Sequence, residues 1–209
     1  ERGSQHRCGL HGAAHRGIEV VEPREEHGVE GRWQLVTDRE VEHHQLELVK
    51  GDLADPEIAL QGAFLPDPSI FAGYVAMDLP GAGEPASIAT DAMVHMLTTI
   101  QHPDGHWSRY IPRPPIQASD ITATASAMHM MQSFPIPARQ RELESSVQRA
   151  RAWLVKARAE TNEERVHQLL GLAWAGDESS TLRPLAEALI AQQHADGGWA
   201  QLAALESDA

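Results

Sequence analysis

The sequence predicts an all-α fold, built as an array of helical hairpins in the second two-thirds of the chain. Two nearly identical heptads carry this prediction: QHPDGHW at residues 101–107 and QHADGGW at residues 193–199, which are offset by 92 residues. Helix-start signals recur at intervals of 50, 42 and 46 residues, at Ser69, Ser119, Thr161 and Ser207. A period of about 45 residues is typical of helix-pair repeats, both open solenoids and closed toroids. No strand pattern competes with this interpretation, and the alternative is an irregular helical bundle.

Residues 1–60 differ in composition from the remainder of the chain. They are rich in Arg and Glu, and they contain the histidines His6, His11, His15, His27, His43 and His44. Because apolar residues keep no helical period there, the segment buries too little apolar surface to offset its conformational entropy. We therefore expect a polar leader, or the remnant of a preceding region, with little order. Metal binding by the histidines is the alternative, although their spacing fits no fixed ligand pattern.

From residue 67 onward the pattern is helical. Apolar residues recur at helical spacing, and Pro or Gly follows most of the periodic runs. The expected helices cover residues 67–80, 90–100, 119–134, 137–156, 161–176 and the stretch from 180 to the second heptad. The sequence stops at Asp208 and Ala209, where a third Ser-Asp segment begins. We interpret residues 67–209 as toroid-type or solenoid-type repeats that are truncated at the C-terminus.

The bulk composition argues against several classes of function. The net charge is −13, and no block of Lys and Arg provides the basic surface that nucleic acid or anionic lipid requires. The single cysteine, Cys8, excludes an intrachain disulfide and a thiolate zinc cage. No apolar run approaches the roughly 20 residues that a membrane span needs. We therefore expect no nucleic-acid partner and no membrane span, while localisation stays open.

Within each heptad, the residue types suit a turn that joins two helical hairpins. Asp-Gly favours a tight turn after a helix end, and Trp covers the joint with a large flat surface. The Gln side chain can bond the free backbone groups of a neighbouring helix terminus. We expect both tryptophans to be largely buried against a neighbouring helix joint. The structural residues of this prediction are Gln101, Asp104, Gly105, Trp107, Gln193, Asp196, Gly197 and Trp199.

The pattern Gln-x-x-Asp-Gly-x-Trp after a helix resembles the QW motif of squalene and hopene cyclases, whose toroidal relatives include the β-subunits of protein prenyltransferases. Residues 67–209 resemble bacterial prenyltransferase/squalene-oxidase repeat proteins, for which RPP at 113–115, SDITATA at 119–125 and TNE at 161–163 look typical. The resemblance implies an α/α toroid with inner and outer helices, of which about three hairpins are present. The helices that begin near Ser69, Ser119, Thr161 and Ser207 would be the inner ones.

The catalytic motifs that the resemblance implies do not occur in this sequence. The cyclases protonate their substrate through Asp-x-Asp-Asp, and ionising terpene synthases bind magnesium through Asp-Asp-x-x-Asp. Prenyltransferase β-subunits hold zinc with Asp, Cys and His, but Cys8 lies in the wrong region. Cys8 and His11 form only a remnant of a Cys-x-x-Cys-His haem attachment site. No cofactor and no metal are therefore predicted.

The remaining candidate residues lie at the starts of the inner helices. Asp120, Glu163 and Asp208 are the weak catalytic candidates, because in a toroid these N-termini would gather around one mouth of the central cavity. N-capping in water is the structural alternative for them. A further set of side chains either lines an apolar pocket or packs in the core: Met128, Met130, Met131 and Trp174.

Two functions remain open from the sequence. In the first, the chain is part of an isoprenoid-related enzyme whose acid motif lies outside these residues. In the second, a non-catalytic toroid binds a hydrophobic ligand or a partner protein. The partners we expect are a hydrophobic or isoprenoid small molecule and the remainder of the same polypeptide. The missing acid and metal motifs favour the second function for these residues, and the resemblance favours the first.

Overall fold

A computed structural model of the chain describes residues 55–60, 67–81, 83–111, 113 and 119–207, together with two short strands nearer the N-terminus. The chain divides into two units, residues 1–47 and residues 48–209. In the first unit, β1 (Ile18–Glu19) pairs antiparallel with β2 (Val36–Thr37). This short ladder is not among the predicted elements. Helix α2 (Pro56–Leu60), in the second unit, also lies within the segment 1–60 and corrects the expectation of little order at that place. The rest of that expectation concerns residues outside those described.

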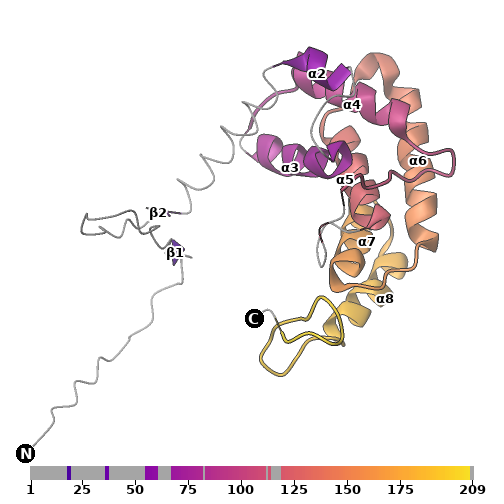
Figure 1. Cartoon of the computed structure of the whole chain (residues 1–209). Helices are drawn as coiled ribbons and strands as arrows, with labels where there is room; N and C mark the ends of the chain where they lie inside the picture. The colour runs from indigo at the N-terminus through magenta and orange to yellow at the C-terminus, as the bar shows by residue number, and fades with distance from the viewer. Residues whose placement is uncertain are drawn as a thin grey trace, which may run out of the picture. The chain divides into compact units, whose positions relative to one another are not determined.

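The described part of the second unit is all-α, as the sequence predicts (Figure 1). Its elements are α2 (Pro56–Leu60), α3 (Pro68–Gly81), α4 (Ile88–Ile100), α5 (Asp120–Ser133), the 3-10 turn η1 (Pro137–Arg139), α6 (Gln140–Lys156), α7 (Asn162–Trp174) and α8 (Ser179–Ile190). Ser119 and Thr161 are N-caps of α5 and α7, as expected. Helix α4 begins earlier than predicted, because the Ser87 side chain caps it by accepting from the Thr90 backbone N–H.

Helix α5 is the centre of the packing, since it contacts α3 on one side and α7 on the other (Figure 1). Most of its residues are buried, and many of them are small: Ala123, Thr124, Ala125, Ser126 and Ala127. Small side chains on all three helices allow this close approach. A β-carbon on Gly73 of α3 would collide with Ser126, and one on Gly171 of α7 would press on Ala125.

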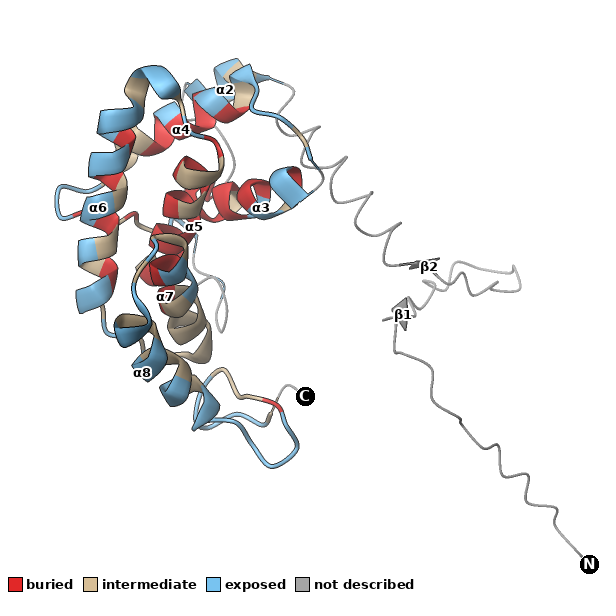
Figure 2. Cartoon of the chain, turned by 180° about the vertical axis from the view of Figure 1, so that it is seen from behind, coloured by how far each residue is buried: buried red, intermediate tan, exposed pale blue. Residues whose placement is uncertain are grey.

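Burial decreases from α5 toward the C-terminal hairpin (Figure 2). Helix α6 packs against both α5 and α7, whereas α8 packs chiefly against α7 and has no buried residue. Ile190 at the end of α8 is 64% exposed, and Leu202 and Leu205 beyond it are 44% and 46% exposed. The C-terminal hairpin therefore leaves apolar surface uncovered. None of the described helices combines the length and the apolar character of a membrane span.

Candidate functional site

The first heptad forms a closed turn directly after α4. The His102 N–H donates to the carbonyl oxygen of His106 at 2.9 Å, and the Gly105 N–H donates to the carbonyl oxygen of His102 at 2.9 Å. Gly105 has a φ of 107°, a conformation that L side chains rarely adopt. The Asp-Gly turn that the sequence predicts is therefore present at this position.

Trp107 joins this turn to two helices. Its side chain is fully buried, as the sequence leads one to expect, and its indole Nε1–H donates to the carbonyl oxygen of Leu97 near the end of α4 at 2.8 Å. The Trp107 backbone N–H donates to Oγ1 of Thr124 on α5 at 3.0 Å. The same residue thus satisfies a carbonyl at a helix C-terminus and fixes the turn to the central helix.

Gln101 docks the turn on α6. Its Nε2 donates to the carbonyl oxygen of Gly105 within the turn at 2.9 Å and to the carbonyl oxygen of Ser146 on α6 at 3.0 Å. Arg149 completes the junction, because its guanidinium donates to Oε1 of Gln101. Sequence reasoning did not find Ser146 and Arg149. The available signal was their spacing, since they follow Gln101 by 45 and 48 residues, one repeat period.

A cluster of polar and aromatic side chains surrounds the first turn. His106 Nδ1 lies 2.6 Å from Oδ1 of Asp104, and the hydrogen bond from His106 holds the pKa of Asp104 below its usual range. The His106 ring stacks on His102 and on Trp153 of α6, with centroid distances of 4.2 and 5.2 Å. Ser108 Oγ lies 3.3 Å from Nε2 of His106 and 3.1 Å from Nε2 of His102.

Carboxylate, imidazole and hydroxyl in this cluster follow the order of a hydrolase triad, but two features argue against that use. The carboxylate of Asp104 is 58% exposed, whereas the acid of such a triad is buried and fixes the imidazole. The Ser108 hydroxyl is shared between two imidazoles rather than held by one. We therefore infer that these side chains stabilise the turn rather than catalyse a reaction.

The second heptad repeats the internal hydrogen bonds of the first. The Gln193 side chain donates to the carbonyl oxygen of Gly197 at 2.6 Å, and the Trp199 indole donates to the carbonyl oxygen of Leu189 at 2.8 Å. Gly197 has a φ of 93°. The Gly198 N–H donates to Asp196 Oδ1, and this backbone hydrogen bond is the largest cause of a lowered Asp196 pKa. The two heptads therefore adopt the same turn.

Outside the turn the two copies differ. The Trp199 side chain is only partly buried, and a β-carbon on Gly197 would have no heavy atom within 4 Å. In the described part of the chain, no second helix docks on Gln193 as α6 docks on Gln101. The expectation that Trp199 lies against a neighbouring helix joint is therefore not met. The loop that follows instead returns to the start of its own hairpin, where Gln201 accepts hydrogen bonds from the Asn162 and Glu163 N–H groups.

The candidate acids at the inner-helix starts have separate partners. Asp120 forms an ion pair with Arg109 at 2.8 Å and also accepts from the Arg109 backbone N–H at 3.2 Å. Glu163 accepts from the Thr122 hydroxyl at 3.4 Å, so it links α7 to α5. Asp208 lies outside the described residues. No group of three or more His, Cys, Asp or Glu side chains suited to a metal ion occurs among the residues that the structure describes.

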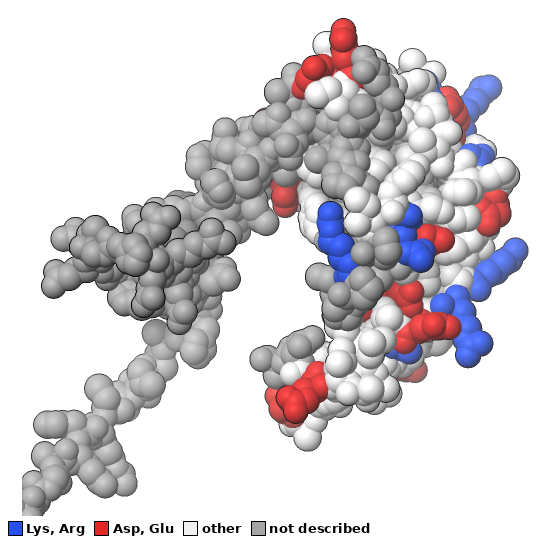
Figure 3. Space-filling model, viewed as in Figure 1, with Lys and Arg blue, Asp and Glu red and all other residues white. Residues whose placement is uncertain are grey.

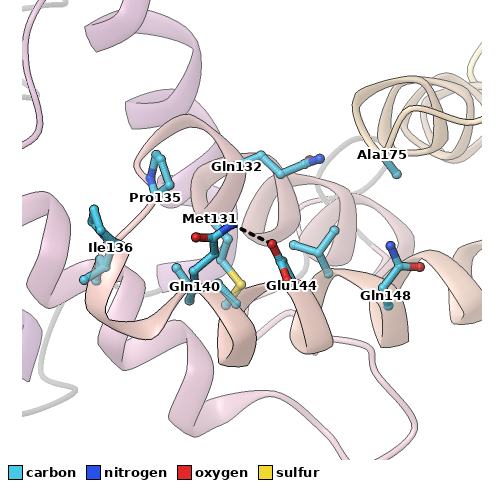
Figure 4. Close-up of a pocket in the computed structure, with 11 residues that line it drawn as sticks. Met131, Gln132, Pro135, Ile136, Gln140, Glu144, Gln148 and Ala175 are labelled. Carbon is cyan, nitrogen blue, oxygen red and sulfur yellow. Dashed lines mark hydrogen bonds between the residues drawn. The ribbon is translucent and has the colours of Figure 1, made fainter.

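A cavity of about 520 Å³ lies where the end of α5, η1 and the first turns of α6 meet (Figure 4). Its lining is mainly apolar, with glutamines and one glutamate among the hydrocarbon side chains: Met131, Gln132, Pro135, Ile136, Pro137, Gln140, Leu143, Glu144, Val147, Gln148 and Ala175. A volume of this size accommodates a small-molecule ligand. The cavity lies away from the candidate acids, and sequence reasoning did not locate it.

Two glutamines supply polar groups at the cavity. Gln140 Nε2 donates to Oε1 of Glu144 at 2.8 Å, one turn along α6 (Figure 4). Gln132 Nε2 donates to the carbonyl oxygen of Trp174 at 2.7 Å, while its Oε1 is buried and accepts no hydrogen bond among the described residues. A buried acceptor without a donor carries a desolvation cost.

Four side chains were predicted either to line an apolar pocket or to pack in the core, and the structure contains examples of both. Met131 lines the cavity, whereas Met128 and Met130 are not among its lining residues and are fully buried on α5. Trp174 stacks on His129 with a centroid distance of 3.9 Å. On the face shown in Figure 3, acidic and basic side chains are interspersed rather than gathered into one basic area.

Comparison with protein-family models, with curated proteins and with solved structures finds no match for this chain.

Proposed function

We propose that residues 67–207 are part of an α/α toroid and that they bind a hydrophobic small molecule of the isoprenoid class in the cavity between α5 and α6. The observation that carries the proposal is the cavity of about 520 Å³ with its mainly apolar lining. The toroid part is supported by the packing order, in which α3, α5 and α7 are successive neighbours, α4 and α6 connect them in the chain, and α8 packs on α7.

The composition of the lining narrows the ligand class. Apolar groups come from Met131, Ile136, Leu143 and Val147, and no Lys or Arg is among the described lining residues. A diphosphate needs cationic partners to leave water, so an isoprenoid diphosphate is a poor ligand here. An uncharged isoprenoid alcohol suits the site better, because it needs no cationic partner and its hydroxyl can hydrogen-bond to the glutamine and glutamate side chains of the lining.

A competition experiment tests the proposal. Nile red, an uncharged dye that fluoresces in apolar sites, is titrated onto the 209-residue chain and then displaced with farnesol or with farnesyl diphosphate. Farnesol is expected to displace the dye, and farnesyl diphosphate to compete at least tenfold more weakly, which corresponds to about 1.4 kcal/mol. Failure of farnesol to displace the dye would contradict the proposal.

A pair of matched variants places the ligand in this cavity. Val147→Phe adds bulk to the lining on α6 and is expected to weaken farnesol binding at least tenfold, a loss of about 1.4 kcal/mol. Val155→Phe makes the same change at a 49% exposed position of the same helix, outside the lining, and should leave binding unchanged. Equal effects of the two variants would show that the dye and farnesol bind elsewhere.

A further inference from the structure

The two heptads present the same chemical groups, but among the residues that the structure describes only the first has a helix docked on it. In each, the glutamine amide bonds the glycine carbonyl, the indole bonds a leucine carbonyl of the preceding helix, and the glycine has a positive φ. The first turn is covered by α6, and the second lies beside the exposed side chains of Ile190, Leu202 and Leu205. The first junction therefore serves as a template for what the second can bind.

The template is a stripe along one face of α6. Ser146 supplies a backbone carbonyl to Gln101, Arg149 supplies a guanidinium to the same side chain, and Trp153 supplies a ring to His106. These positions follow one another at intervals of three and four residues, so they lie on one side of the helix. Gly105 permits the approach, because any β-carbon there would collide with the Arg149 carbonyl group.

Charge complementarity accompanies the contact in the template. Helix α6 contains four Lys and Arg residues and two Glu residues, a net charge of +2. Residues 88–107, which include the helix and turn that α6 covers, contain two Asp and no Lys or Arg, a net charge of −2. Opposite charges on two docking surfaces favour association and disfavour partners of like charge.

The segment around the second turn has a negative net charge, like the segment that α6 covers, and its turn presents the same hydrogen-bonding groups. Residues 178–207 contain four Asp and Glu residues and one Arg, a net charge of −3. No described residue of another element hydrogen-bonds to Oε1 of Gln193, and the space over Gly197 is open to 4 Å. Where the first turn carries His106, the second carries Gly198, so an aromatic side chain in the partner is not required.

We propose that the turn at residues 193–199 is a docking surface for a helix of a partner protein. This partner helix carries the α6 pattern, a small residue followed three positions later by arginine, and has a net positive charge. In the docked state Gln193 Nε2 donates to a carbonyl of the partner helix, and the partner arginine donates to Gln193 Oε1. Gly197 allows the partner backbone to approach, and Ile190 loses exposure to water. This surface is separate from the α5–α6 cavity, so the inference does not depend on the proposed ligand.

A synthetic peptide with the sequence of α6 (residues 140–156) is the probe, titrated onto the 209-residue chain and followed by the indole N–H signals of the tryptophans in proton–nitrogen NMR spectra. The Trp199 signal is expected to shift in a saturable manner. The Trp107 signal should stay in place, because the α6 helix of the same chain already covers it at a high effective concentration. Absence of a Trp199 shift at millimolar peptide would overturn the proposal.

Matched variants separate this recognition from general charge attraction. The peptide with Arg149→Met should bind at least fivefold more weakly than the peptide with Arg141→Met, which has the same net charge. In the chain, Gln193→Leu should weaken binding at least tenfold, whereas Gln192→Leu, at the neighbouring exposed position, should not. The unshifted Trp199 signal of each variant without peptide reports whether the turn is intact. The proposal would be contradicted if the two peptide variants, or the two chain variants, lost the same amount of binding affinity. Self-association of the chain through this surface would also contradict it.

Discussion

The backbone carbonyl of Arg149 lies so close to Gly105 that it would collide with a β-carbon there, so glycine is required at this position for α6 to dock on the first heptad. Gly105 also has a φ of 107°, which alone disfavours any other residue. Gly197 has a similar φ of 93° but open space around it. Both glycines are therefore needed for the backbone conformation of the turn, but only Gly105 is also needed for the approach of a second helix.

Gly105→Ala is expected to lower the free energy of unfolding by about 3 kcal/mol, because backbone strain adds to displacement of α6. Gly197→Ala should cost only about 1 kcal/mol, the strain without the collision. Urea denaturation followed by circular dichroism measures both values. Equal costs in the two variants would show that the contact between Gly105 and Arg149 does not contribute to stability.

Trp107→Phe removes the indole N–H that satisfies the Leu97 carbonyl, and it leaves a small cavity in the core. We expect a loss of about 2–3 kcal/mol in the free energy of unfolding. Trp199→Phe removes the equivalent bond to Leu189, but water can reach a partly exposed site, so the loss should stay below about 1 kcal/mol. The same denaturation experiment compares the two, and a reversed order would contradict the assignment of the buried and the open junction.

Local signals in the sequence predict the helices well. Ser119 and Thr161, which the sequence marks as helix starts, are found as N-caps, because a cap depends on residues that are close together in the chain. Helix α4 begins at Ile88 rather than at Thr90, since both Ser87 and Thr90 are able to cap and Ser87 takes that position. Boundaries of this kind are set by a competition that composition alone does not decide.

The site depends on contacts between distant residues, and these were harder to predict. The repeat of the heptads predicts two equal junctions, but their internal sequence does not say which has a neighbour. That difference comes from Ser146 and Arg149, which belong to another helix. The cavity arises because Pro135 and Pro137 turn the chain between α5 and α6, and no periodic pattern marks it. The resemblance to toroidal cyclases stays a prediction.

Thr161→Ala tests the capping box at the start of α7. The Thr161 hydroxyl accepts from the Glu164 N–H at 3.2 Å, and Glu164 Oε2 accepts from the Thr161 N–H at 2.8 Å. Loss of the hydroxyl should lower the free energy of unfolding by about 1 kcal/mol. Ser180→Ala, in the first turn of α8 where no side-chain cap is present, should change it by less than about 0.5 kcal/mol. Thermal or urea unfolding distinguishes these values.

His129 on α5 is expected to make the fold less stable in weak acid. Partial burial lowers the pKa of His129 from its ordinary value of 6.5, and the ring stacks on Trp174 of α7 with an interplanar angle of 10°. Since the unfolded chain binds a proton at higher pH than the folded chain does, the free energy of unfolding increases with pH in this range. Above pH 6.5 the neutral His129 ring therefore does not lower the free energy of unfolding. As the pH falls below 6.5, protonation of this residue in the unfolded chain lowers the free energy of unfolding.

His129→Phe retains an aromatic ring for stacking but removes the titration. Relative to the parent chain, the variant should gain stability progressively as the pH falls from 7 to 5, so that its free energy of unfolding changes less over this interval. Urea denaturation at several pH values measures the difference. Taking the difference between variant and parent cancels the contributions of the other histidines, provided that they are unchanged.

His167→Phe, at a part-buried position on α7 whose ring lies 3.0 Å from the Glu163 carbonyl oxygen, is the control for removing any histidine. A pH dependence that is the same in His129→Phe and the parent would place the acid-sensitive group elsewhere.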